Sequence, residues 1–210
     1  MYMVLLSAFV VLLQRYSGQE DICVGSPVAN RTQRELEGMI GFFVNALVIR
    51  TDLGGDPDFT ELLGRVRAAT LEAYDHQQAP FEKVVERVVT DRDWSRNPLF
   101  QVKFALENLA EGTRVEGERE AIAAAMILDL SLTVVTGREG PIGYGIGYST
   151  ELFGRERMNR MGRHYEQLLK SVVSDRGQRI SQLSLLTQEE EIRLASFNNT
   201  EVDYPDKTIV

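Results

Sequence analysis

Two stretches of the chain are almost purely hydrophobic, and they predict its most deeply buried elements. Met1–Leu13 is apolar except for Ser7. It is shorter than the ~20 residues that a membrane-spanning helix needs, and neither a basic region nor a cleavage site flanks it as in a secretory signal. We therefore expect a helix buried in the core. Ile40–Arg50 is apolar and rich in β-branched residues without alternation, which predicts a strand covered on both faces.

The rest of the chain changes repeatedly between strand-like and helix-like spacing of its apolar residues. This mixture lacks the strict β-α-β alternation of a doubly wound fold, so it favours an α/β layer architecture with a mixed sheet. The opening helix is predicted to continue to about Tyr16, and the further predicted helices are Phe59–Asp75, Phe81–Val89, Arg155–Val173 and Thr187–Phe197. The further predicted strands are Asp21–Ala29, Leu99–Leu106, Met126–Val135 and Ile142–Ser149. Polar stretches predict a long loop over Glu107–Arg119, a turn over Gly137–Pro141 and a linker over Asn198–Val210.

Composition and charge narrow the possible partners. A chain of 210 residues with 43% hydrophobic residues can bury a substantial core. The 31 acidic residues outnumber the 23 Lys and Arg residues, which gives a net charge of −8 without any basic run. Nucleic acid and membrane are therefore not expected as partners. The single cysteine, Cys23, excludes an internal disulfide framework and suits a reducing compartment, so we expect a cytoplasmic protein.

The sequence holds no local set of residues for catalysis or metal binding. Its two histidines, His76 and His164, do not occur at a metal-ligand spacing with another His, a Cys or a carboxylate pair. Cys23 has no neighbouring base, so a structural thiol is expected. The alternating glycines of Gly143–Gly147 lie inside a strand pattern rather than between a strand and a helix, which argues against a phosphate loop. We expect no metal and no self-contained active site.

One polar residue interrupts the hydrophobic run between residues 40 and 50. Asn45 carries two hydrogen-bond donors and two acceptor sites on its amide, and leaving a buried polar group unpaired costs about 1–3 kcal/mol. Two interpretations follow. Either backbone groups of the fold satisfy the amide, or the amide points toward a ligand that binds and leaves.

Several motifs, in order and at plausible intervals, resemble one protein family. Ile40–Arg50, His76–Glu82 and Arg92–Leu99, together with the opening helix and Gly18–Asp21, resemble the later half of the condensation domains of non-ribosomal peptide synthetases. The tail Leu185–Pro205 resembles the linker that leads into an adenylation domain. The resemblance implies that residues 1–185 form the C-terminal subdomain of a condensation domain and that residues 186–210 begin the linker.

The resemblance also implies a fold, a reaction and partners. The expected fold is an α/β, two-layer mixed-sheet sandwich like a chloramphenicol acetyltransferase subdomain, paired in a V shape with an N-terminal condensation subdomain. In that family a tunnel between the subdomains admits two phosphopantetheine arms from peptidyl carrier proteins, and an amide bond forms between the two thioesters that the arms carry. The expected partners are therefore the N-terminal subdomain, peptidyl carrier proteins and an adenylation domain, and no cofactor is expected to bind this chain directly.

The catalytic motif of the family is absent from this sequence. The signature His-His-x-x-x-Asp-Gly belongs to the earlier half of the domain, and this chain contains neither a His-His pair nor an Asp-Gly pair. The resemblance thus implies that the chain contributes a wall of the tunnel, supplies no catalytic residue and is inactive by itself. Such a wall still matters, because holding two reactants in near-attack geometry can be worth about 7–11 kcal/mol.

The resemblance carries over to specific positions in this sequence. Asn45 and Ala46 are expected at the tunnel. Arg50 is expected to form a structural ion pair. The other motif residues are expected to fix the helix junction and the loop before the following strand: His76, Glu82, Arg92, Asp93, Arg96 and Asn97. The chain departs from the family pattern at Ala46, where a Thr is usual, and at Gln78 and Ala79, where an aspartate and an aromatic residue are common.

Two alternative functions share the same motifs. The first is a non-catalytic docking module for carrier or adenylation domains, which the sequence does not separate from a catalytic subdomain. The second is a relative of epimerisation domains, which share the fold but do not normally run into an adenylation linker. The tail Leu185–Pro205 argues against this second alternative.

Overall fold

The computed structural model describes residues 1–93, 95–108, 128–137 and 142–200. Within these residues a single five-stranded sheet has the strand order β2-β1-β3-β4-β5. The pairs β1–β2 and β4–β5 are antiparallel, whereas β1–β3 and β3–β4 are parallel, so the expected mixed sheet is confirmed. The strands are β1 (Asp21–Val28), β2 (Asn45–Asp52), β3 (Val102–Asn108), β4 (Leu130–Thr136) and β5 (Gly143–Tyr148).

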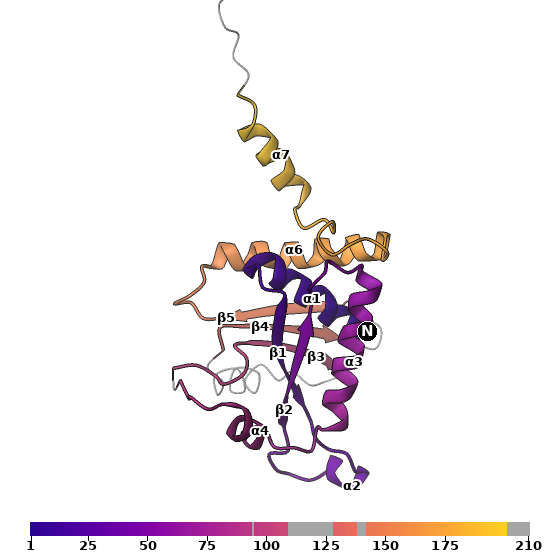
Figure 1. Cartoon of the computed structure of the whole chain (residues 1–210), viewed down its shortest axis with the longest axis vertical. Helices are drawn as coiled ribbons and strands as arrows, with labels where there is room; N and C mark the ends of the chain where they lie inside the picture. Colours follow the sequence, from indigo (N-terminus) through magenta and orange to yellow (C-terminus); the bar gives the residue numbers. More distant parts are fainter. Residues whose placement is uncertain (94, 109–127, 138–141, 201–210) are drawn as a thin grey trace, which may run out of the picture.

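Helices cover one face of this sheet and give the molecule two layers (Figure 1). The covering helices are α1 (Tyr2–Ser17), α3 (Phe59–Asp75) and α6 (Arg155–Ser174), and their apolar residues share one core cluster with residues of β1 to β4. In the part of the chain that the structure describes, three other helices lie outside this layer: α2 (Arg34–Glu37), α4 (Phe81–Val88) and α7 (Gln188–Phe197). The predicted α/β two-layer architecture is therefore correct.

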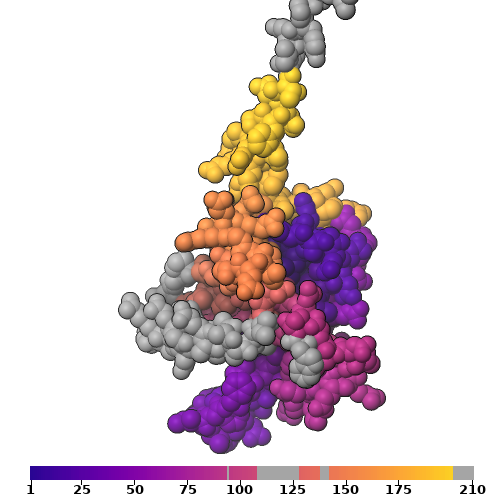
Figure 2. Space-filling model, turned by 90° about the vertical axis from the view of Figure 1, so that its left-hand side faces the viewer, coloured from indigo at the N-terminus to yellow at the C-terminus, as the bar shows by residue number. Residues whose placement is uncertain are grey.

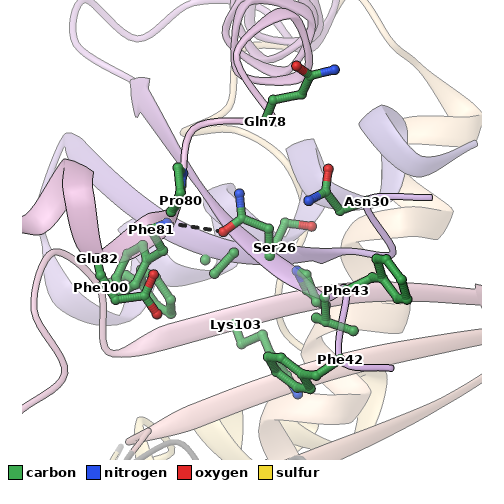
Figure 3. Close-up of a pocket in the computed structure, with 15 residues that line it drawn as sticks. Ser26, Asn30, Phe42, Phe43, Gln78, Pro80, Phe81, Glu82, Phe100 and Lys103 are labelled. Atoms are coloured by element: carbon green, nitrogen blue, oxygen red, sulfur yellow. Dashed lines mark hydrogen bonds between the residues drawn. The ribbon is translucent and has the colours of Figure 1, made fainter. Parts of the chain in front are cut away.

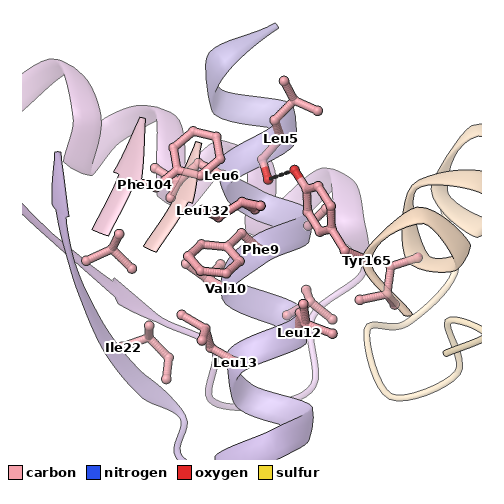
Figure 4. Packing of buried hydrophobic residues seen from close by; sticks show 14 of the residues in the cluster. Leu5, Leu6, Phe9, Val10, Leu12, Leu13, Ile22, Phe104, Leu132 and Tyr165 are labelled. Carbon is pink, nitrogen blue, oxygen red and sulfur yellow. Dashed lines mark hydrogen bonds between the residues drawn. The ribbon is translucent and has the colours of Figure 1, made fainter. Parts of the chain in front are cut away.

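Helix α1 is buried on all of its sides, as the opening hydrophobic run predicts. Every residue from Leu5 to Leu13 is buried, and α1 packs between the sheet and helices α3 and α6 (Figure 4). The hydroxyl group of Tyr165 in α6 donates a hydrogen bond of 3.0 Å to the Leu5 carbonyl oxygen. Gly18 ends the helix in the left-handed conformation that glycine adopts readily. No helix within the described residues is long and apolar enough to cross a lipid bilayer.

The prediction of one long strand over Ile40–Arg50, covered on both faces, is wrong. The strand begins only at Asn45, and β2 lies at the edge of the sheet, where it pairs with β1 alone. Ile40 and Phe42 precede it and are 104% and 90% exposed. The uninterrupted apolar run therefore combines two separate structures. One is an edge strand with alternating burial, and the other is an exposed apolar segment that contributes nothing to the sheet.

Other element boundaries differ from the prediction by a few residues. Strand β3 starts at Val102 rather than Leu99, because Leu99 has a positive φ of 70° and bends the chain before the strand. Strand β4 starts at Leu130 instead of Met126, although residues 126 and 127 lie outside the described part. Most of the predicted loop over residues 107–119 and most of the predicted turn over residues 137–141 also lie outside the described part, as do residues 201–210 of the predicted linker.

Helix α7 extends away from the two layers (Figure 1, Figure 2) and is tied to them by a polar cluster. Thr187 and Glu190 form a capping box at its start, which their spacing in the sequence favours. The Glu190 carboxylate also lies 2.9 Å from Nε2 of the buried His164, and the Tyr16 hydroxyl lies 2.8 Å from Nδ1 of the same ring. A neutral imidazole that donates from Nε2 and accepts at Nδ1 fits both contacts.

The surroundings of Glu190 stabilise its charged form. Burial alone would raise the pKa of this carboxyl group, but hydrogen bonds from the Thr187 backbone, from His164 and from the Thr187 hydroxyl lower the pKa from 4.5 to about 2. Because its pKa is lower in the folded protein than in the unfolded chain, this carboxylate stabilises the fold at any pH above its usual pKa of 4.5. This stabilisation is lost as the pH falls from about 4.5 toward 2.

We therefore predict that acid releases α7 from the layers. A spin label at position 192, introduced by Ile192→Cys in a Cys23→Ser background, should become more mobile in electron paramagnetic resonance spectra as the pH falls below about 4.5. Glu190→Gln should give the mobile spectrum already at neutral pH, because it removes the carboxylate that His164 and Thr187 hold. Glu189→Gln is the matched control on the exposed neighbour. Equal mobility of the label in the Glu190→Gln and Glu189→Gln variants would contradict the conclusion that the Glu190 carboxylate holds α7 against the layers.

Candidate functional site

A cavity of about 710 Å³ lies where β1 ends and β2 begins. Its walls come from these two strands, from residues 42–44, from the loop between α3 and α4, and from Phe100 and Lys103. This volume is typical of pockets that hold small ligands. In Figure 3, one side of the pocket holds Phe81, Glu82 and Phe100, and the other holds Asn30, Phe42 and Phe43.

A close contact between a glycine and an aromatic ring forms one wall of the pocket. The ring of Phe100 lies so near Gly25 that an added Cβ at residue 25 would be only 2.1 Å from Cε2 of the ring. Phe81, at the start of α4, packs against Phe100 with ring centroids 5.6 Å apart. The absence of a side chain at Gly25 thus allows the aromatic pair to cover the central strands. Any larger residue at this position of β1 would displace the ring of Phe100.

Asn45 fastens the loop between α3 and α4 to the start of β2. Its Nδ2 group donates hydrogen bonds of 2.8 Å to the Gln77 and Ala79 carbonyl oxygens, and its Oδ1 atom accepts one of 3.1 Å from the Phe81 backbone N–H. Of the two interpretations above, the first therefore describes this structure, in which backbone groups satisfy the amide. Asn45 and Ala46 both line the pocket, and the loop that Asn45 holds forms part of its wall.

Lys103 is a pocket residue that the sequence analysis did not identify. It lies on the central strand β3 beside Gly25 of β1, and it is 9% exposed. Burial lowers the pKa of its ammonium group, and the carboxylate of Glu107 raises that pKa by a smaller amount. The sequence does contain a sign of this residue, because Lys103 interrupts the otherwise apolar run Val102–Ala105. Lysine side chains are seldom buried, so a lysine in a predicted strand deserves consideration as a site residue.

Arg50 forms a bidentate ion pair on the solvent-exposed end of the sheet. Its guanidinium group donates from Nε to Asp21 at 2.9 Å and from Nη2 at 2.6 Å, which joins β2 to β1. The hydrogen bonds from Arg50 hold the pKa of the Asp21 carboxyl group below its usual value. Arg50 does not line the pocket, so the structure places it in the scaffold beside the site.

Only one of the remaining motif residues contributes to the pocket wall. Glu82, in the first turn of α4, lines the pocket, whereas His76 ends α3 and is exposed. Asp93 accepts hydrogen bonds from the Ser95 backbone and hydroxyl at 2.9 and 2.7 Å and so fixes the loop before β3. The other predicted members of this loop, outside the pocket wall, are Arg92, Arg96 and Asn97.

The pocket contains neither of the histidines of the chain. His164 is buried beneath α7, and His76 lies outside the pocket wall. Ser26 lines the pocket, but its Oγ atom accepts a hydrogen bond of 2.7 Å from the Tyr2 hydroxyl. Among the described residues, no group of three or more His, Cys, Asp or Glu side chains could hold a metal ion. The described site can therefore bind and position a ligand, but it offers no activated nucleophile with its base.

Comparison with known proteins identifies the family to which this architecture belongs. A family model described as "Condensation domain" matches residues 1–195. A linear gramicidin synthase of Brevibacillus parabrevis is 46% identical over 98% of this chain, and surfactin synthase subunit 1 of Bacillus subtilis (strain 168) is 40% identical over 100% of it. The chain spans only 4% and 6% of these two relatives.

Solved structures show the same fold. A complex of the X-domain and OxyB from teicoplanin biosynthesis matches with a TM-score of 0.77 and 30% identity, and the match covers 90% of this chain and 43% of that one. A four-domain non-ribosomal peptide synthetase, holo-AB3403 bound to AMP and glycine, matches with a TM-score of 0.77 over 90% of this chain and 16% of that one, at 24% identity. The chain described here is a member of the condensation domain family.

Proposed function

We propose that this chain is the C-terminal half of an amide-forming condensation domain in a non-ribosomal peptide synthetase. In this role it provides one wall of a cleft in which an amine on one carrier-bound arm attacks the thioester on another. The observation that carries the proposal is the pocket of about 710 Å³, which is shaped for a ligand but has no histidine among its described lining residues. The base would come from a second polypeptide segment.

The extent of the structural match supports the idea of a half domain. The match to the X-domain complex covers 90% of this chain but 43% of the solved chain, and a match to the condensation domain of MokA covers 85% and 42%. The sequence also lacks the paired histidines of the family signature. These observations favour a partner half that carries the reactive imidazole.

An exposed apolar segment beside the pocket supports such a partner. Met39, Ile40, Phe42 and Val44 are all large hydrophobic residues with exposed side chains, and Phe42 and Val44 also line the pocket. Clustered apolar groups of this kind usually mark a surface that another protein covers. We assign this segment to contact with the N-terminal condensation subdomain, which would close the pocket into a tunnel.

The proposed reaction requires positioning more than strong acid–base chemistry. The amine nitrogen forms a bond to the thioester carbonyl carbon, the carbon–sulfur bond breaks, and the departing thiol receives the proton that the amine loses. Holding the two arms in near-attack geometry can lower the barrier by about 7–11 kcal/mol. The residues of this chain would contribute through the shape of the pocket and the fixed α3–α4 loop, and the phosphopantetheine arms would enter as carrier-bound substrates.

The same proposal assigns the end of the chain to a linker. Residues 1–185 would form the subdomain, and residues 186–210 would lead toward an adenylation domain, with α7 at the start of this linker. The contact between His164 and Glu190 would set the direction in which the linker leaves the subdomain. Peptidyl carrier proteins and an adenylation domain would be the further partners, in the cytoplasm.

We predict that activity returns when the missing half is supplied. The 210-residue chain, mixed with the N-terminal half of a condensation domain from a related synthetase, should form dipeptide from two loaded carrier proteins, as detected by mass spectrometry. The chain alone should form none, because the sequence lacks the paired histidines of the family signature and no histidine lines the described pocket. A folded, associated mixture without product would favour a docking module, and turnover by the pure chain would refute the half-domain proposal.

A second prediction tests whether Asn45 acts through the loop that it holds. In the reconstituted domain, Asn45→Ala should slow dipeptide formation by about tenfold while the melting temperature falls by only a few degrees. The reason is that the lost hydrogen bonds, each worth about 0.5–1.5 kcal/mol, tie down a loop rather than the core. Gln182→Ala, which removes an exposed amide elsewhere, is the control. Unfolding in parallel with the loss of rate would restrict Asn45 to a structural role.

A further inference from the structure

Lys103 carries a positive charge into the apolar part of the pocket. Strand β3 is the central strand of the sheet, and its alternation sends Phe104 into the core beneath the helices and Lys103 to the opposite face. The side chain of Lys103 is 9% exposed and lines the pocket together with Phe42 and Phe100 (Figure 3). A cation thus lies beside aromatic rings rather than in solvent.

No described residue forms a hydrogen bond or ion pair with the Lys103 ammonium group. Glu107 is the carboxylate that acts on it electrostatically, and its influence is smaller than the effect of burial. Glu82, the other charged residue among the described lining residues, is exposed. A buried charge without a partner is costly, and proteins usually pair such groups. Among the described residues, the Lys103 ammonium group therefore has no counter-charge in hydrogen-bond or ion-pair contact.

We propose that Lys103 binds the anionic group, a carboxylate or a phosphate, of a slender and largely apolar ligand in this pocket. The aromatic residues would pack along the apolar part of the ligand, while the ammonium group would receive the anion at the bottom. The exposed carboxylate of Glu82 on another side of the pocket would disfavour the reversed orientation. This inference rests on the proposed function only in treating the pocket as the substrate cleft, and it adds that one substrate there carries a negative charge.

Two sources could supply such an anion, and matched probes distinguish them. The first pair is 4-phenylbutanoate and its neutral amide, which represents a carboxylate on an acyl or aminoacyl group. The second pair is 4′-phosphopantetheine and pantetheine, which represents the phosphate of a carrier arm. Binding of each probe to the 210-residue chain near neutral pH is measured by isothermal titration calorimetry, which requires no turnover.

We predict that the anionic member of at least one pair binds about tenfold tighter than its neutral partner, as a charge-assisted hydrogen bond should provide. Lys103→Met should abolish this preference and leave the affinity for the neutral probe nearly unchanged. Lys103→Arg should retain the preference. Lys83→Met makes the same substitution on the exposed face of α4, outside the pocket, and should behave like the unmodified chain.

Each result has a definite meaning. A preference that depends on Lys103 in the carboxylate pair or in the phosphate pair supports the inference and identifies the source of the anion. Equal affinities within both pairs, a preference that survives Lys103→Met, or one that Lys83→Met also abolishes would overturn it. Lys103→Gln replaces Lys103→Met if circular dichroism shows that the methionine variant is unfolded. Because binding is measured apart from turnover, a chain that restores dipeptide formation without any anion preference would refute this inference alone.

Discussion

Helix α1 lies between the sheet and helices α3 and α6, and its burial on every side determines the rest of the arrangement. A helix that is apolar all round must be covered all round, so one face of the sheet is fully occupied by α1 and its two neighbours. Residues that alternate to the other face, such as Gly25 and Lys103, are consequently not covered by α1, α3 or α6. The pocket therefore arises on the side of the sheet that the core does not use.

The elements that could be predicted from sequence are those whose burial depends on local spacing. Helices α3 and α6 show apolar residues at helical intervals, and the capping residues Asp58 and Thr187 mark the starts of α3 and α7. Each of these signals reports on a segment of a few turns and needs no knowledge of distant residues. The condensation-domain motifs were recognised for a similar reason, because they are continuous stretches of sequence.

The features that escaped prediction depend on contacts between distant segments. An apolar run can form a strand buried on both faces or an edge strand preceded by an exposed segment, and only the pairing of β2 with β1 alone decides between them. Likewise, the hydrogen bonds of Asn45 reach residues 77, 79 and 81, which no local pattern connects to it. Lys103 interrupts an apolar run in the sequence, but its place in a pocket becomes apparent only when its neighbours across the sheet are known.

The pocket combines a fixed loop with a buried cation, and these two features have different physical consequences. The loop that Asn45 holds acts on geometry, so it can affect every substrate that must approach the same point. The Lys103 ammonium group acts on charge in a partly desolvated setting, so it can distinguish one substrate from another of equal size. In the proposed half domain, these two features would influence both the rate of the reaction and the choice of substrate, and the partner half would provide the proton transfer.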